Sequence, residues 1–165
     1  MSDPDPLDQQ IKLWTAAMPD VDTRGLALLG RTRRIALRAR LAIEAIYARH
    51  GIDSGGFDVL AALRRAPEPH RMRPTDLYRA LMISSGGLTA KLNKLEAARL
   101  IQRQAASEDR RSLSVELTPR GKQVAEAAFR KEMGLEARMI AGLTEKEQWV
   151  LEALLKKLEA TLDGA

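Results

Sequence analysis

The chain has 165 residues, of which 45% are apolar and 30% charged, and these ordinary globular values exclude wholesale disorder. Lys and Arg (27) outnumber Asp and Glu (22), giving a net charge of +5 and a first indication of an acidic partner such as nucleic acid. Cysteine is absent, which excludes disulfides, Cys-bound zinc and a thiol nucleophile, and the acidic N-terminus and lack of long apolar runs predict a cytoplasmic protein without a membrane partner.

The N-terminal part is acidic and then helical. Residues 1–23 carry five Asp and one Lys, with a short amphipathic segment over 7–18. Asp22 or Thr23 can cap a long helix that runs to about His50. That helix is apolar on more than one face, as expected for a helix that packs against other parts of the protein on two sides. We assign residues 1–53 to dimerisation.

Residues 54–117 have the pattern of a small core that combines helices with a hairpin. Two helices joined by a short polar turn are the geometry of a helix-turn-helix, and the strand that follows alternates apolar and polar residues. The expected elements are a helix capped by Ser54 that runs to about Arg65, a loop over 66–70, helices over 75–81 and 84–99, strands over 100–104 and 113–117, and a polar turn over 106–111.

The C-terminal part predicts two further helices. Thr118 and Pro119 are typical of an N-cap followed by N1, and Thr144 with Glu147 forms a capping box. These helices carry more Leu than one small core can cover, so we expect residues 118–165 and 1–53 to form a homodimer. The predicted fold class is mainly α with a small β-hairpin wing, a winged helix-turn-helix core flanked by dimerisation helices.

The second helix of the helix-turn-helix has one apolar and one polar face. Leu88, Leu92 and Leu95 lie together on its wheel, and the opposite face holds small or hydrogen-bonding side chains that suit a DNA major groove. Ser84 and Ser85 lie at its N-terminus, where a phosphate is favoured. The candidate DNA-binding residues of this segment are Ser84, Ser85, Gly86, Gly87, Thr89, Ala90, Lys91, Asn93 and Lys94.

Two readings of Gly86 and Gly87 are open. Each glycine costs a helix roughly 1 kcal/mol relative to Ala, which close approach of the backbone to DNA would explain. Alternatively, the helix begins after Gly87. The hairpin turn carries Asp109, Arg110 and Arg111, and arginines favour a narrow minor groove, although a solvated charged turn has the same composition.

Two runs resemble the MarR family of winged-helix transcription regulators. One is DRRSLSVELTPRG (109–121), which is similar to the family's wing signature, and the other is PTDLYRALMISSGGLTAKLNKLEAARLIQR (74–103), which is similar to its helix-turn-helix. The resemblance implies that Arg111 enters the minor groove, that Asp109 orients it, and that a homodimer reads a pseudo-palindrome. The chain departs from the family at Ala90, often polar or basic, and at Arg99, often Gly.

The resulting hypothesis is a sequence-specific double-stranded DNA-binding regulator, more often a repressor in such families. The alternatives are a winged-helix protein-interaction module and a non-specific architectural DNA binder. We expect no enzyme activity, cofactor or metal site. The resemblance also implies a small aromatic or anionic effector, with Arg38, Arg40, Tyr47 and Phe57 as candidate pocket residues, although core packing and surface arginines explain them equally well.

Overall fold

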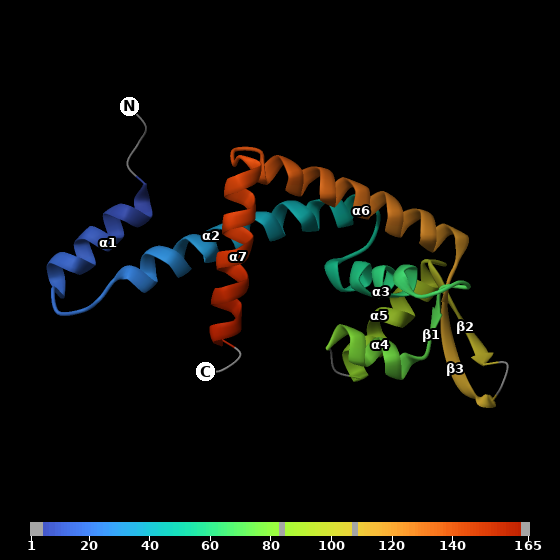
Figure 1. The fold of residues 1–165 in the computed structure, drawn as a ribbon. Helices are drawn as coiled ribbons and strands as arrows, with labels where there is room; N and C mark the ends of the chain where they lie inside the picture. The colour runs from blue at the N-terminus through green and yellow to red at the C-terminus, as the bar shows by residue number, and fades with distance from the viewer. Residues whose placement is uncertain (1–4, 83–84, 107–108, 163–165) are drawn as a thin grey trace. The chain divides into compact units, whose positions relative to one another are not determined.

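The computed structural model describes residues 5–82, 85–106 and 109–162, which divide into two compact units, residues 1–45 and residues 46–165 (Figure 1). Helix α2 begins in the first unit and ends in the second. The elements in chain order are α1 (Pro6–Ala17), α2 (Arg24–Arg49), α3 (Ser54–Arg65), β1 (Arg71–Met72), α4 (Pro74–Leu81), α5 (Ser85–Ala97), β2 (Ile101–Ala106), β3 (Asp109–Leu117), α6 (Pro119–Ile140) and α7 (Glu145–Leu162).

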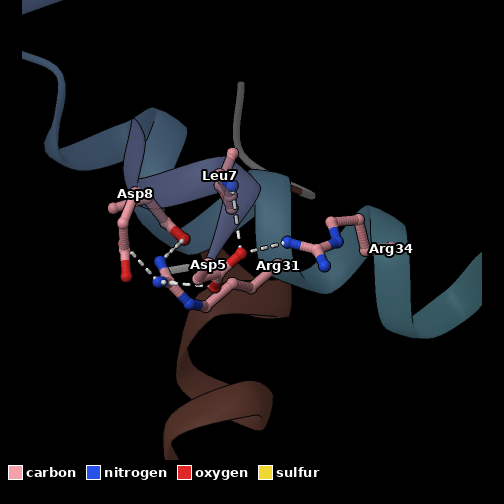
Figure 2. A network of polar contacts seen from close by, with 6 residues as sticks. Asp5, Leu7, Asp8, Arg31 and Arg34 are labelled. Carbon is pink, nitrogen blue, oxygen red and sulfur yellow. Dashed lines mark hydrogen bonds and ion pairs between the residues drawn. The ribbon is translucent and has the colours of Figure 1, made fainter. Parts of the chain in front are cut away.

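In the first unit, acidic residues at the start of α1 bind arginines of α2 (Figure 2). Asp5 caps α1 by accepting from the Leu7 N–H at 3.0 Å, and it also accepts from Arg34 Nη1 at 2.7 Å. Arg31 Nη2 donates to Asp8 at 2.5 Å and to Asp5 at 3.3 Å. Leu7 is buried beside this network. The negative charge of the N-terminal segment therefore neutralises part of the positive charge of α2.

In the second unit, α3 is the central helix and contacts α4, α5, α6 and β3. Its residues Val59, Leu60 and Leu63 are fully buried, as the amphipathic spacing requires. The predicted cap at Ser54 is wrong by one residue. Asp53 is the N-cap, because its carboxylate accepts from the Gly56 N–H at 2.7 Å.

The predicted two-stranded hairpin is a three-stranded antiparallel sheet in the order β1-β3-β2. The added strand pairs Arg71 with Glu116 and Met72 with Val115, and it is too short to show an alternating pattern in the sequence. Val115 and Leu117 are buried as expected, but Leu113 is 57% exposed. Leu113 pairs with Ala105, next to an irregularity in the register, toward the outer end of the hairpin.

The C-terminal helices begin where the sequence predicts. Thr118 caps α6 by accepting from the Gly121 N–H at 2.9 Å, and Glu147 accepts from both the backbone and the hydroxyl of Thr144 at the start of α7. No described residue of α7 is buried, although Trp149 and Leu154 are among its side chains. No helix in the described part of the chain is long and apolar enough to cross a membrane.

Candidate nucleic-acid interface

Helix α5 has two distinct faces, as its wheel predicts. Leu88, Leu92 and Leu95 are each at most 4% exposed and pack into the core. The residues predicted to face outward are exposed or half-buried. Gly86, Thr89, Ala90, Asn93 and Lys94 are exposed, while Gly87 and Lys91 are half-buried.

Lys94 is held by the cap of the neighbouring helix. Its Nζ donates to Asp53 Oδ2 at 2.8 Å, while Oδ1 of the same carboxylate caps α3. The hydrogen bond from Lys94 and then that from Gly56 hold the pKa of Asp53 below its ordinary value. Lys94 therefore needs to exchange a protein carboxylate for a phosphate before it can contact DNA. An exposed ion pair of this kind contributes at most about 1 kcal/mol, so the exchange is inexpensive.

Asn93 is tied to the sheet. Arg103 on β2 donates from Nη2 to Asn93 Oδ1 at 2.5 Å, and its Nε lies 3.5 Å from Glu96 Oε2. One arginine thus spans α5 and the strand that leads to the wing. The amide oxygen of Asn93 is engaged in this bond, which leaves the amide NH₂ as the group that can reach a base edge.

Lys91 lies along α3. A Cβ built on Gly55 would be 1.8 Å from the Lys91 Nζ, so the glycine leaves the space that this side chain fills. Asp53, Gly55 and Arg103 were not among the predicted site residues. The Asp-x-x-Gly spacing at 53–56 could have indicated the cap, but nothing in the sequence pairs these residues with α5.

Gly86 and Gly87 lie inside the helix, because α5 begins at Ser85, so the alternative of a helix that begins after Gly87 is wrong. A Cβ built on Gly86 would meet nothing within 4 Å. Internal packing therefore does not require a glycine at position 86. No contact among the described residues explains why the helix carries a residue that lowers its stability there.

The wing residues are described only in their backbone. Asp109, Arg110 and Arg111 belong to β3, which pairs with β2. Their side chains lie outside the described part, as do Ser84 and the side chain of Ser85. Before β2, Arg99 adopts a left-handed conformation with a φ of 59°.

The candidate pocket residues are divided between the two units. Arg38 and Arg40 are exposed in the first unit, and Arg40 Nε lies 3.7 Å from Glu44 Oε1. Tyr47 and Phe57 are buried in the second unit and stack with ring centroids 4.4 Å apart. Phe57 also lines a cavity of about 700 Å³ between α3, the following loop and α6. The described residues contain no group of three His, Asp or Glu placed to hold a metal ion.

Three comparisons match this architecture. The MarR family profile matches residues 50–112. The chain is 29% identical to the transcriptional regulator PecS of Dickeya dadantii over 92% of both chains, and 32% identical to the multiple antibiotic resistance protein MarR of Salmonella typhimurium over 62% of this chain and 69% of that protein. A mutant MarR from E. coli, solved in complex with operator DNA, superimposes with a TM-score of 0.66 at 25% identity, covering 88% of this chain and 97% of that one.

These relatives are transcription regulators, which confirms the expectation of a regulator and not an enzyme. The order of the elements, with a helix-turn-helix followed by a β-hairpin, is the winged-helix arrangement. The chain belongs to the MarR family of winged-helix transcriptional regulators.

Proposed function

We propose that the protein is a sequence-specific repressor that binds a pseudo-palindromic operator as a homodimer. Each subunit places α5 in the major groove and the wing, with Arg110 and Arg111, in the adjacent minor groove. The observation that carries the proposal is the outward face of α5, where the exposed residues are small or polar (Gly86, Thr89, Ala90 and Asn93). The leucines of α5 are buried on its other face. The operator complex of the related E. coli MarR supports this use of the fold.

The homodimer is supported by apolar surface on the terminal helices. Trp149 is 70% and Leu154 59% exposed on α7, and α2 exposes Leu28 and Ile35. Apolar surface of this extent favours association. In this proposal residues 1–53 and 118–165 serve dimerisation, and residues 54–117 bind DNA. Two-fold symmetry then places the half-sites about 10 bp apart, or a multiple of one helical turn.

Release by a small aromatic or anionic effector completes the proposal. The cavity beside Phe57 is also lined by Phe129, which offers an aromatic wall, and by Arg64 and Arg130. Both arginines pair with Glu126, which lines the same cavity, so an anionic effector would have to displace this carboxylate. Arg38, Arg40 and Tyr47 stay candidate effector residues. Such a ligand acts only if it binds the DNA-incompetent dimer more tightly than the competent one.

Selection of duplexes from a randomised library, followed by fluorescence anisotropy over a range of salt concentrations, tests the function. We expect one enriched inverted repeat, bound by two chains. If affinity is the same for all sequences and falls equally with salt concentration, the protein is instead a non-specific architectural binder. Absence of any salt-dependent binding would favour a protein-interaction module.

The dimer is tested separately by Leu154→Glu, which places a charge in the proposed interface. Sedimentation velocity should show monomers, and operator affinity should fall. The matched control is Lys157→Glu, which introduces the same side chain at an exposed polar position of α7. A dimer that persists in Leu154→Glu would contradict the assignment of α7.

A further inference from the structure

A basic groove lies between the end of α2 and the C-terminal half of α6, within residues 46–165. It has a volume of about 450 Å³. The basic side chains that line it are Arg49 at the end of α2, His50 directly after it, and Arg130, Lys131 and Arg138 from α6. No carboxylate lines this groove.

Three of these cations have no counter-charge. Among the residues that the structure describes, Arg49, Lys131 and Arg138 form no ion pair, and all three are exposed. Arg130 pairs with Glu126, one turn away, at 3.2 Å. Like charges brought together in this way repel one another, so the cluster is most stable when an anion occupies it.

Helix α6 separates its charges around its axis. Arg130, Gly134 and Arg138 follow each other at four-residue spacing, which places them along one face. Glu132 lies on the opposite side, where its carboxylate accepts a hydrogen bond from the Tyr47 hydroxyl. Glu126 is the exception: it lies one turn before Arg130 and pairs with it, but it also pairs with Arg64, so it offsets only part of the positive charge of the groove.

Gly134 lies on the groove side in the C-terminal half of this 22-residue helix. A Cβ built there would meet only Arg138 Nη1, at 3.9 Å, so internal packing does not require a glycine. An interior helix glycine costs roughly 1 kcal/mol relative to Ala. Close approach of a ligand to the helix backbone explains why the groove has no side chain at this position.

The groove is remote from the proposed DNA-reading helix. Helix α3 contacts both α5 and α6 and lies between them (Figure 1). A duplex bound by α5 is therefore on the far side of α3 from the groove. Its occupant is a separate ligand and not the operator.

We propose that this groove binds a small molecule that carries two or more linked phosphate groups. Guanidinium groups match phosphate oxygens through paired N–H donors, and Lys131 adds a point charge. Several neighbouring cations favour a multivalent anion over a single phosphate. The volume of the groove accommodates a polyphosphate chain with part of an attached group. Ligand binding in this groove does not require that the protein bind an operator.

The test is calorimetric titration of the full-length protein with inorganic tripolyphosphate, inorganic phosphate and ATP at 150 mM salt, where long-range attraction is screened. We expect one saturable tripolyphosphate site per chain and much weaker binding of phosphate. ATP that binds more tightly than tripolyphosphate would indicate that the attached group also contacts the groove, and equal affinity would indicate recognition of the phosphates alone.

Three variants make the test specific. Lys131→Gln and Arg138→Gln should each weaken tripolyphosphate binding about tenfold or more, because each removes charge-assisted contacts. Gly134→Leu should weaken it without changing the charge, since its side chain fills the groove. Arg120→Gln, at the other end of α6, is the control and should bind normally. Equal affinity in all variants, equal losses in Arg120→Gln and Arg138→Gln, or no saturable binding would each overturn the proposal.

Discussion

Lys94 of α5 and Asp53 of α3 form an ion pair with Nζ and Oδ2 2.8 Å apart. The same carboxylate caps α3 through the Gly56 N–H. One aspartate therefore stabilises the helix behind the DNA-reading helix and also holds one of the cations proposed to contact DNA.

Asp53→Asn separates these two roles. Asparagine caps helices as well as aspartate does, so the free energy of unfolding should fall by no more than the ion pair contributes, at most about 1 kcal/mol. Lys94 loses its counter-charge and becomes available to a phosphate. We expect tighter DNA binding at low salt, with a slope of log affinity against log salt that is steeper by about 0.9.

The control for this change is Asp53→Ala, which removes the cap as well. Urea unfolding should then show a loss about 1 kcal/mol larger than in Asp53→Asn, together with the same steeper salt slope. An Asp53→Asn variant with an unchanged salt slope would show that Lys94 does not contact phosphate.

Gly86→Ala should affect stability and DNA binding in opposite directions. The added methyl group meets nothing within 4 Å, so the helix should gain up to about 1 kcal/mol in urea unfolding. Operator affinity should fall if the backbone approaches DNA closely at this point. Gly25→Ala, also in open space in a helix, should leave operator affinity unchanged. An affinity that does not fall in Gly86→Ala would exclude close approach.

Arg111→Ala tests the wing. Loss of a minor-groove arginine should weaken operator binding by about 1–3 kcal/mol in fluorescence anisotropy. Sedimentation velocity should show an intact dimer, since β3 lies in the proposed DNA-binding part of the chain. Unchanged operator affinity would show that the wing does not read the minor groove.

The helices were largely predictable because their signals are local. Apolar spacing places Leu88, Leu92 and Leu95 inward, and Thr118 and Thr144 begin their helices as the capping rules predict. These signals depend on residues within one or two turns of each other. The start of α5 was ambiguous because two glycines weaken the local helix signal.

Contacts between distant segments were not predictable. Asp53 reaches Lys94 across 41 positions and Asp5 reaches Arg34 across 29, and neither pair has a periodic signature. The two-residue strand β1 exists only because β3 offers it partners. The charge distribution of the N-terminal segment is likewise explained only by the arginines of α2 that it meets (Figure 2).

Arg99 provides a stability test at a position where the sequence departs from the family. Its φ of 59° is unfavourable for a side chain with a Cβ and is tolerated by glycine. Arg99→Gly should raise the free energy of unfolding by roughly 1 kcal/mol, since relief of backbone strain exceeds the entropy cost of glycine. A matched Arg120→Gly change, in the first turn of α6 at ordinary helical dihedrals, should destabilise the protein. Equal effects of the two substitutions would contradict this account.

The raised pKa of Glu132 leads us to expect that the stability of the protein decreases as pH rises. Burial raises the pKa of Glu132, the carboxylates of Glu136 and Asp58 raise it further, and the hydrogen bond from Tyr47 only partly opposes them. One of its oxygens, Oε2, is buried and accepts no hydrogen bond from the described residues. The folded state therefore favours the protonated acid.

Because the folded pKa exceeds the unfolded value of about 4.3, this contribution to stability is complete below about pH 4.3 and is lost as pH rises through the folded pKa. Glu132→Gln keeps an acceptor for the Tyr47 hydroxyl and cannot ionise. The difference in unfolding free energy between the variant and the wild type should therefore grow in favour of the variant between pH 4 and pH 7. Asp58, whose pKa burial also raises, is present in both proteins, so it enters this difference only through its repulsion of the Glu132 carboxylate. Urea titrations at several pH values in this range measure the difference in unfolding free energy. The control is Glu159→Gln, which changes an exposed glutamate of α7. If the difference between Glu132→Gln and the wild type is the same at all pH values, Glu132 is not the titrating group.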